Sequence, residues 1–320
     1  MKKILVSATN YSRYCTKAKR LLVDNGCEVI ENPHGRPFTF DELKPIVGEI
    51  DGVVAGVDNW NENVFRIAPR LKIIARFGVG ADNIDIARAA EHGIAVTNCP
   101  GINANAVAEQ AVGLLLSIVR QIPRLNASTS KGKWERLMFP ELRGKRLAML
   151  GFGAVACKFA QKMAGFDMEM VACDKYPNYE KAKELNVKMV TFEEAISTAD
   201  FISIHLPALP ELYHIINSQT ISMMKDGVYI VNTARGVLAD ENAVYDALKS
   251  GKIAGYASDV FEVEPARQDN KLFELDNYVC TPHTAAETYE NYEQCGLVTA
   301  KAILDVFAGK TPENLLNKIQ

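Results

Sequence analysis

The 320-residue sequence lacks several features that would assign it to a specialised class of protein. Its seven cysteines include no CxxC pair and no Cys/His cluster with metal-ligand spacing, which argues against a disulfide scaffold and a metal site. The longest apolar run, 147–157, is shorter than the ~20 residues of a membrane helix, and the N-terminal apolar stretch is too short for a signal peptide. Lys+Arg 36 against Asp+Glu 39 leaves no basic surplus for binding nucleic acid. We therefore expect a soluble, cytoplasmic protein with reduced thiols and with no metal, nucleic-acid or membrane partner.

The sequence does contain a regular alternation of strand and helix patterns. The length predicts two domains, and 48% apolar with 23% charged residues is ordinary for a globular protein. Short β-rich runs alternate with helical stretches, which is typical of an α/β fold with parallel sheets. The predicted strands are 3–7, 28–31, 52–55, 71–75 and 94–96 in a first series and 146–150, 169–173, 188–190, 201–204, 228–231, 253–258 and 277–280 in a second. Long helices are expected over 104–127, between the two series, and over 286–307, after them.

Residues 151–156 read G-x-G-x-x-A between a predicted strand and a predicted helix, which is the context of a dinucleotide-binding loop. Gly151 would allow the tight turn, and Gly153 would let the backbone approach a pyrophosphate at the helix N-terminus. Asp174 follows the next strand, where a carboxylate accepts hydrogen bonds from ribose hydroxyls and repels a 2′-phosphate. The sequence therefore favours NAD over NADP, although Lys175 weakens that preference. The alternative is a glycine turn in a sheet that binds no nucleotide.

Three polar segments follow later strands, at the edge where open α/β sheets bind their ligands. They carry Arg235, Glu264 and His283. An arginine fork matches a carboxylate, and a histidine titrates near neutral pH, with a pKa that a neighbouring glutamate raises. An arginine, a glutamate and a histidine together suggest a site for a small anion whose reaction needs a proton. The alternative is that the histidine has only a structural role. Three other histidines show no partner pattern and are interpreted as surface or packing residues: His34, His92 and His214.

Along essentially its whole length the sequence also resembles the D-isomer-specific 2-hydroxyacid dehydrogenases, and among them D-3-phosphoglycerate dehydrogenases most. The motifs occur in the family's order. They are residues 77–80 and 82–85, Asn103, residues 107–109, the glycine loop at 151–156, and residues 205–207, 232–236, 259–265 and 282–283. The sequence Lys-Trp-Glu-Arg at 133–136 is a further match. Each motif is weak alone, but the ordered series is specific.

The resemblance implies two doubly wound parallel-sheet domains. A Rossmann domain that binds NAD, residues 101–284, would be inserted into a flavodoxin-like substrate domain, residues 1–100 and 285–320, with closure of the two lobes excluding water. The resemblance also implies a homodimer, whose seam is expected along the linking helix near 114–119. The length leaves no room for the serine-binding regulatory domain of long phosphoglycerate dehydrogenases, so that form of control is not expected.

The resemblance further implies roles for individual residues. Arg235 would bind the substrate carboxylate and keto oxygen, His283 would exchange the proton, and Glu264 would orient the imidazole. Cofactor contacts are implied for Val79, Gly151, Gly153, Ala154, Val155, Asp174, His205, Leu206, Pro207, Thr233, Ala234, Arg235, Asp259, His283 and Ala285. Asp259 would accept a hydrogen bond from the nicotinamide carboxamide. Substrate contacts are implied for Arg76, Gly78, Val79, Gly80, Asn103 and Arg235.

Two departures from the family pattern affect these expectations. Ala154 stands where relatives commonly have an arginine that reaches the pyrophosphate, so cofactor affinity is expected to be lower. Ala55, with Asp58 nearby, stands where phosphoglycerate dehydrogenases often have an arginine for the substrate phosphate, although Arg76 matches a second one. Thus 3-phosphoglycerate is one candidate substrate, and glyoxylate, hydroxypyruvate or another small 2-keto acid are the others.

Two further functions remain open at this point. The same motifs occur in NAD-sensing proteins that resemble the C-terminal-binding-protein corepressors, although their long tails are missing here. Oxidation of formate or phosphite is the other alternative. Formate dehydrogenases of this superfamily have glutamine at the position of Glu264, which argues against that branch.

Overall fold

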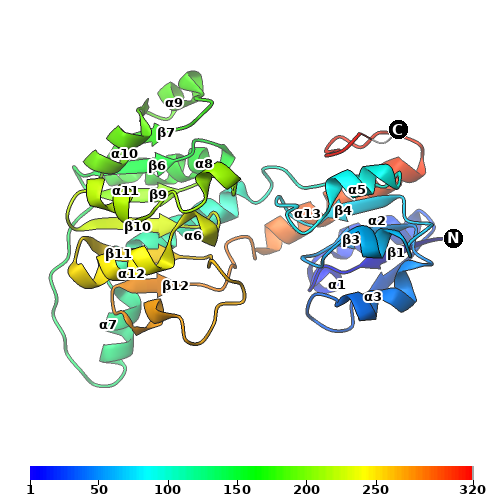
Figure 1. The fold of residues 1–320 in the computed structure, drawn as a ribbon, viewed down its shortest axis with the longest axis horizontal. Coiled ribbons are helices and arrows are strands. Elements are labelled where there is room, and N and C mark those ends of the chain that lie inside the picture. Colours follow the sequence, from blue (N-terminus) through cyan, green and yellow to red (C-terminus); the bar gives the residue numbers. More distant parts are fainter. Residues whose placement is uncertain (319–320) are drawn as a thin grey trace. The chain divides into compact units, whose positions relative to one another are not determined.

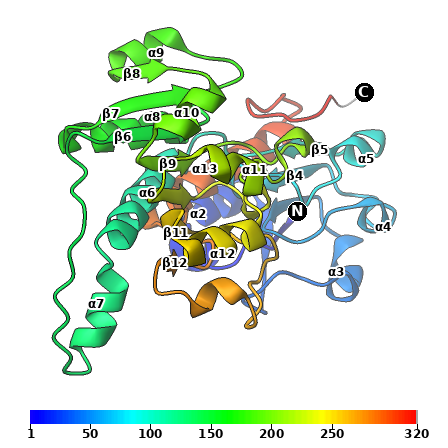
Figure 2. The ribbon, with the colours of Figure 1, turned by 60° about the vertical axis from the view of Figure 1, so that its left-hand side comes forward.

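The chain, in a computed structural model that describes residues 1–318, divides into two compact units. Unit 1 is formed by Met1–Asn103 together with the chain from Glu287 onward, and unit 2 by Ala104–Ala286. The boundaries therefore fall after residues 103 and 286, where the sequence suggested 100 and 284. Figures 1 and 2 show both units as sheets flanked by helices. The α/β fold class with two parallel sheets is confirmed.

Unit 1 is built on a five-stranded sheet with the order β2-β1-β3-β4-β5, in which each strand pair is parallel. This is the flavodoxin-like order of a doubly wound sheet. Its strands are β1 Lys2–Val6, β2 Cys27–Glu31, β3 Gly52–Ala55, β4 Ile73–Arg76 and β5 Ala95–Thr97. Its helices are α1 Tyr11–Tyr14, α2 Thr16–Asp24, α3 Phe40–Val47, α4 Glu62–Phe65, α5 Ile86–Glu91 and α13 Tyr289–Phe307.

Alternating side chains of these strands enter two different cores, because successive strand residues point to opposite faces of a sheet. Leu5, Val53 and Ile74 pack with the apolar residues of α3, α4 and α5. Ile4 and Val54 pack on the other face with residues of α2 and α13. Both faces of the sheet are therefore covered, and the carboxyl ends of the strands are the part left for ligands.

Unit 2 is built on a seven-stranded parallel sheet with the order β12-β11-β10-β9-β6-β7-β8. The order reverses between β6 and β9, which is the switch point of a Rossmann sheet. The strands are β6 Arg146–Leu150, β7 Glu169–Cys173, β8 Val187–Met189, β9 Phe201–Ile204, β10 Val228–Asn232, β11 Ile253–Ser258 and β12 Tyr278–Cys280. The α-helices are α6 Ala104–Val119, α7 Ile122–Thr129, α8 Ala154–Met163, α9 Tyr179–Glu184, α10 Phe192–Thr198, α11 Ser218–Met223 and α12 Glu241–Ser250. Four 3₁₀ turns complete it: η1 Ala164–Phe166, η2 Pro210–Leu212, η3 Gly236–Leu238 and η4 Lys271–Glu274.

The helix expected over 104–127 is interrupted in the structure. It ends as α6 at Val119, and Gln121, with φ 52°, turns the chain before α7 begins. Leu115 and Ile118 of α6 are buried in the unit's own core, so the run 114–119 does not form the exposed seam that the sequence suggested. The exposed apolar side chains lie further on, at Trp134 and Met138, in the segment that follows α7 and extends away from the sheet with it (Figures 1 and 2).

Other differences from the expected elements are small. The C-terminal helix begins at Tyr289 rather than at 286, because the Thr288 side chain accepts a hydrogen bond from the Asn291 N–H and caps the helix there. All seven cysteines are free thiols. Within residues 1–318, no helix is long and apolar enough to cross a membrane, and no cluster of three or more His, Cys, Asp or Glu side chains has the arrangement of a metal site.

Candidate functional site

Six segments that follow the strands of unit 2 meet at one edge of its sheet, because all of these strands run in the same direction. They contain most of the residues that the sequence suggested for catalysis and for the cofactor. The segments follow β6, β7, β9, β10, β11 and β12, and they carry Gly151, Asp174, His205, Arg235, Glu264 and His283 respectively.

Glu264 and His283 are in direct contact. Nδ1 of the imidazole lies 2.7 Å from Oε2 of the carboxylate, and the other carboxylate oxygen accepts the Phe261 N–H at 3.0 Å. The hydrogen bond to Glu264 raises the pKa of His283, although burial opposes the rise. Burial alone would raise the pKa of Glu264, but the hydrogen bonds from His283 and Phe261 lower it on balance. The imidazole therefore stays protonated to a higher pH than a free histidine would, while its side chain is 46% exposed.

The positive charge of Arg235 lowers the pKa of both Glu264 and His283, which indicates that Arg235 lies near this pair. Two hydrogen bonds of Asn232 shape the turn that carries it. The Asn232 side-chain oxygen Oδ1 accepts the Ala234 N–H at 3.0 Å, and the Asn232 side-chain amide donates to the Arg235 carbonyl oxygen at 2.9 Å. The structure thus brings together the arginine, the glutamate and the histidine that the sequence picked out.

The backbone of His283 is held in an unusual conformation, with φ 54°. Its N–H donates to the carbonyl oxygen of Asp259 at 2.7 Å. The fully buried Asp259 carboxylate accepts three more bonds from the same loop, from Thr281 Oγ1 at 2.5 Å, Thr284 N at 2.9 Å and Ala285 N at 2.8 Å. A non-glycine residue in this region is strained and persists where its surroundings fix it. Asp259 therefore holds the His283 loop in place, and its suggested contact with a carboxamide stays a prediction.

The glycine loop has the shape that a bound pyrophosphate requires. Gly151 has φ 90°, and a Cβ atom there would lie 2.7 Å from the carbonyl oxygen of His205, so only glycine fits. A Cβ atom on Gly153 would meet no protein atom within 4 Å, so the unit's own packing does not require a glycine there. Gly153 is the N-cap of α8, and no side chain caps that helix end. Unsatisfied N–H groups and open space at a helix N-terminus form an anion site.

The remaining cofactor candidates differ in what their side chains contact. Asp174 accepts the Phe152 N–H at 2.7 Å and the Tyr176 N–H at 2.8 Å, so it is fixed beside the glycine loop. The buried Thr233 hydroxyl has no hydrogen-bond partner among the described residues, as expected of a group that a ligand completes. Leu206 is half-buried, whereas Pro207 is exposed. Ala154 and Val155 form the first turn of α8, Ala234 is half-buried beside Arg235, and Ala285 is buried through its bond to Asp259.

His205 differs from the sequence-based expectation. Its ring packs 5.2 Å from the Phe159 ring and bonds to Ser203 Oγ at 2.9 Å, and burial lowers its pKa to about 3. The imidazole is therefore a neutral, internally bonded group. Its backbone is the part that faces the glycine loop, because its carbonyl oxygen limits residue 151 to glycine.

The suggested substrate residues lie at the carboxyl ends of the strands of unit 1. Arg76 ends β4, and Gly78 has φ 140° and lies against the Arg76 guanidinium, so a Cβ atom there would come within 3.0 Å of Nη1. The N–H groups of Val79 and Gly80 have no hydrogen-bond partner within the described chain, which leaves them available to a carboxylate. Asn103, which is half-buried, is the last residue of this segment of the unit.

Comparisons with known proteins agree with this geometry. Residues 112–285 match the NAD-binding domain of the D-isomer specific 2-hydroxyacid dehydrogenases. A hydroxypyruvate reductase of Thermotoga maritima is 42% identical over 271 residues, which cover 82% of this chain and 87% of the relative. The chain belongs to this family. Its cofactor is NAD, as the sequence predicted.

Two more members of the family illustrate the range of the likeness. A D-3-phosphoglycerate dehydrogenase of Archaeoglobus fulgidus is 41% identical over 267 residues, which cover 83% of this chain and 51% of the relative. A D-lactate dehydrogenase of Aquifex aeolicus, solved with NAD and lactic acid, is similar with a TM-score of 0.84 at 27% identity, covering 98% of this chain and 99% of that one. The chain spans about half the length of the D-3-phosphoglycerate dehydrogenases to which it is similar.

The arrangement fits the family's cofactor at several points of unit 2. The open space at Gly153, the uncapped α8 terminus, the acid after β7 and the unpartnered Thr233 hydroxyl are the groups that a dinucleotide would use. Ala154 lacks the positive charge that relatives commonly place beside the pyrophosphate, so the backbone N–H groups of α8 would hold it without that help.

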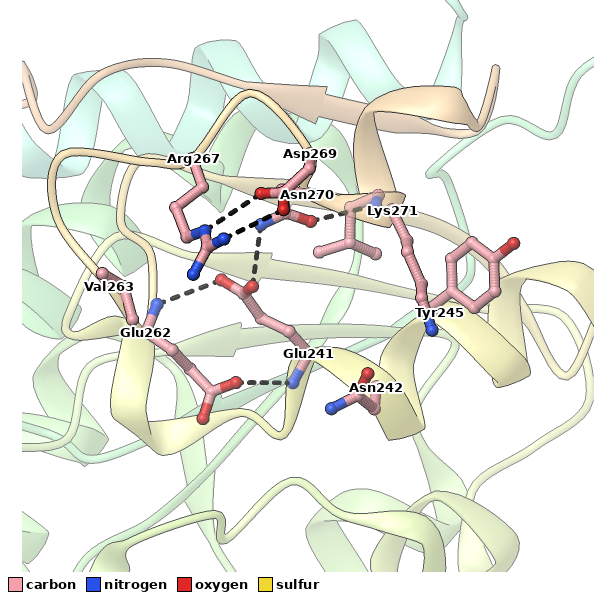
Figure 3. A pocket seen from close by; sticks show the side chains of 10 residues that line it. Glu241, Asn242, Tyr245, Glu262, Val263, Arg267, Asp269, Asn270 and Lys271 are labelled. Atoms are coloured by element: carbon pink, nitrogen blue, oxygen red, sulfur yellow. Dashed lines mark hydrogen bonds and ion pairs between the residues drawn. The ribbon is translucent and has the colours of Figure 1, made fainter.

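Three histidines contact carboxylates that the sequence did not indicate. His214 bonds to the Glu262 carboxylate and stacks on Tyr213 with ring centroids 3.9 Å apart, so it is part of a network rather than an isolated packing residue. His92 lies 3.1 Å from the Glu62 carboxylate and His34 lies 3.8 Å from that of Glu42. These contacts join residues from separate elements, so no local pattern in the sequence could have indicated them. Figure 3 shows Glu262 next to Glu241 and Asn270 at the pocket they line.

Proposed function

We propose that this protein is an NAD-dependent oxidoreductase that transfers a hydride between nicotinamide and a small D-2-hydroxy acid or 2-keto acid. The observation that carries the proposal is the 2.7 Å contact between Glu264 and a partly exposed His283, with Arg235 near both. A protein that only binds NAD has no need of a protonated imidazole held beside an arginine. Family membership supports the same class of reaction.

The proposed roles follow from what each group can do. NADH, when bound, supplies the hydride that reduces the carbonyl carbon of the substrate. His283 donates its proton to the carbonyl oxygen in that direction and removes the hydroxyl proton in the reverse direction. Glu264 keeps the imidazole oriented and charged, and the Arg235 guanidinium binds the substrate carboxylate in a bidentate manner.

Residues of unit 1 are proposed to bind the substrate. The N–H groups of Val79 and Gly80, with Arg76 and Asn103, are the groups we assign to it. The segments that follow β1, β3, β4 and β5, namely 7–10, 56–61, 77–85 and 98–103, contain no lysine or arginine. Arg76, the last residue of β4, is therefore the cation of these segments, and the loop after β2 adds Arg36, which is paired with Glu42 at 2.6 Å.

A buried acid offsets the charge of that arginine. Asp58 is 1% exposed, and its carboxylate accepts hydrogen bonds from the Ser7 hydroxyl and from the Phe38 N–H at 2.5 Å. Burial raises the pKa of Asp58, whereas these bonds and the nearby charge of Arg76 lower it. Phosphate sites in proteins gather several cations. We therefore propose an unphosphorylated substrate such as glyoxylate or hydroxypyruvate.

Reduction of 3-phosphohydroxypyruvate, with D-3-phosphoglycerate as the product, is the second candidate activity. Arg76 and the 41% identity to a phosphoglycerate dehydrogenase favour it. Hydroxypyruvate and 3-phosphohydroxypyruvate differ only in the phosphate, so they form a matched pair of test substrates.

We also propose that the protein forms a homodimer. Trp134 is 83% exposed and Met138 is 96% exposed in the segment that extends from unit 2 after α7. Contiguous exposed apolar side chains mark interaction surfaces, and the exposed Leu137 lies between these two in the sequence. Analytical ultracentrifugation should show a dimer that the Trp134→Glu, Met138→Glu double variant weakens. A wild-type chain that stays monomeric at high concentration would exclude this assembly.

The experiment for the activity is NADH oxidation with glyoxylate, hydroxypyruvate, pyruvate and 3-phosphohydroxypyruvate, with NADPH assayed in parallel. We expect turnover with NADH, a preference for it over NADPH, and a higher kcat/KM for hydroxypyruvate than for its phosphate ester. Preference for the phosphate ester would establish the second candidate. Tight NADH binding without turnover on any 2-keto acid would instead support a corepressor-like role.

A further inference from the structure

We propose that Glu241 and Glu262 form a positioning pair that keeps the Glu264 carboxylate within hydrogen-bond distance of the His283 imidazole. The inference rests on the proposed roles of Glu264 and His283. Neither Glu241 nor Glu262 touches the imidazole, so they act through the backbone between them and the site. Glu241 is the first residue of α12, and Glu262 lies in the loop after β11 that carries Glu264.

The two glutamates bond to each other reciprocally, as Figure 3 shows. The Glu262 N–H donates to the Glu241 carboxylate at 3.0 Å, and the Glu241 N–H donates to the Glu262 carboxylate at 3.2 Å. The Asn270 side-chain amide donates to the second Glu241 oxygen at 2.8 Å, and the His214 ring bonds to the second Glu262 oxygen. Each carboxylate therefore uses one oxygen to join the start of α12 to the β11 loop and the other to bond to Asn270 or His214.

The same loop is clamped from its other side by the turn that carries Arg235. A Cβ atom on Gly236 would lie 1.9 Å from the carbonyl carbon and oxygen of Phe261 and 2.4 Å from the Glu262 nitrogen. Such closeness is incompatible with any side chain, so the backbone of Gly236 lies directly on the Phe261–Glu262 peptide. Gly236, the residue next to Arg235, thus confines the Phe261–Glu262 peptide on one side, and the hydrogen bond to Glu241 holds it on the other.

The peptide held in this way is adjacent to the one that orients Glu264. The Phe261 N–H donates to Oε1 of Glu264 at 3.0 Å, while Oε2 contacts His283. A displacement of the Phe261–Glu262 peptide would shift the Cα atom of Phe261, and with it the Phe261 N–H and the carboxylate that this N–H holds. We infer that the Glu241–Glu262 pair keeps the Glu264 oxygen within hydrogen-bond distance of the imidazole.

Two carboxylates placed side by side need donors around them, and the structure supplies these. The N-terminus of α12 has a positive partial charge that favours carboxylates in its first turn. Asp240, the N-cap, uses its own carboxylate on the N–H groups of Asn242 and Ala243. Arg267, the cation next to this cluster in Figure 3, is paired with Asp269 at 3.0 Å and does not compete for the glutamates. The pair is therefore held by backbone N–H groups, the Asn270 amide and the His214 ring, which fix its direction.

The test measures the pKa of the His283 ring by NMR in the full chain, alongside kcat/KM. The charged groups that act on His283 are Glu264, Arg235 and Asp259, and none of them is altered in the variants. Glu241→Ala removes the acceptor for the Glu262 N–H and should lower the pKa of His283, in the same direction as Glu264→Gln but by less. It should also reduce kcat/KM about 10-fold, the lower end of the effect of lost orienting partners.

Two further variants separate positioning from folding. Glu241→Gln keeps a carbonyl oxygen for the Glu262 N–H and should leave the His283 pKa near that of the wild type. Asp246→Ala, an exposed position on the same helix, is the matched control and should change neither quantity. Should Glu241→Ala fail to fold, Glu241→Asp withdraws the carboxylate by one methylene and should also lower the His283 pKa.

The result that would overturn the proposal is an unchanged His283 pKa in Glu241→Ala and Glu241→Asp, even when their thermal stability falls. That outcome would make Glu241 a residue of helix stability only. The NMR titration needs no substrate, so it gives its answer even when no 2-keto acid is turned over, and a failure of the proposed function is read separately from the wild-type substrate panel.

Discussion

The carboxyl edges of the two sheets differ in how many hydrogen bonds within the protein hold their polar groups. In unit 2 the groups proposed for catalysis are fixed by many directional bonds, so that Asp259 alone ties Thr281, Thr284 and Ala285 to the His283 loop. In unit 1 the edge has Arg76, the buried Asp58 and backbone N–H groups of Val79 and Gly80 that have no partner within residues 1–318, while Arg36 nearby is paired with Glu42. We therefore propose that groups of unit 2 carry out proton transfer, while a few groups of unit 1 select the substrate.

The largest expected effect comes from removing the proton donor of unit 2. His283→Gln leaves a side chain that cannot exchange a proton at neutral pH, so kcat/KM for a 2-keto acid should fall about 10²- to 10⁴-fold. NADH affinity, measured by fluorescence titration, should change little. A variant that retains more than a tenth of the wild-type kcat/KM would place the proton donor elsewhere.

The two glycines of the nucleotide loop should respond in opposite ways. Gly151→Ala forces a Cβ atom against the His205 carbonyl at φ 90°, so it should lose about 1–3 kcal/mol of stability in urea unfolding. Gly153→Ala has open space on the protein side and should keep its stability within about 1 kcal/mol while NAD binding weakens. Equal losses of stability in both variants would contradict the assignment of the Gly153 space to the cofactor.

In unit 1 the selective group is expected to be Asp58. Asp58→Asn removes a buried negative charge but keeps an acceptor for the Phe38 N–H, and its amide N–H can donate to the Ser7 oxygen, which reverses the bond that Ser7 donates to Asp58. The ratio of kcat/KM for hydroxypyruvate to that for 3-phosphohydroxypyruvate should fall about 10-fold, because like charges no longer oppose each other at this edge. Asp24→Asn, an exposed change of the same charge, is the control. A kcat/KM ratio that is the same in both variants would show that Asp58 does not determine substrate selectivity.

The smallest expected effect is a shift in pH dependence. Glu264→Gln removes the hydrogen-bonded charge that raises the pKa of His283. The pH at which 2-keto acid reduction declines should therefore move down. Measuring kcat/KM between pH 5 and 10 for both proteins tests this, and coincident profiles would show that the Glu264 charge does not act on the proton donor.

Much of this arrangement could be predicted from the sequence because its signals are local. The G-x-G-x-x-A loop lies directly between a strand and a helix, and strand periodicity places Arg235, Glu264 and His283 after parallel strands. The break at Gln121 does have a local signal, Pro123 at the start of α7, which the expectation of one helix over 104–127 does not take into account. The contact of His214 with Glu262 and that of Ser7 with Asp58 join residues about 50 positions apart, so they depend on the packed fold.

The central claim is tested most directly by the pH dependence of kcat/KM for the wild-type protein, measured for 2-keto acid reduction and for D-2-hydroxy acid oxidation. The protonated imidazole is needed for reduction and the neutral one for oxidation. Because Glu264 raises the pKa of His283, reduction should fall and oxidation should rise through one shared pKa above 6.5. Limbs that titrate at unrelated pH values, or a reduction rate that rises with pH, would contradict the assignment of His283 as the proton donor.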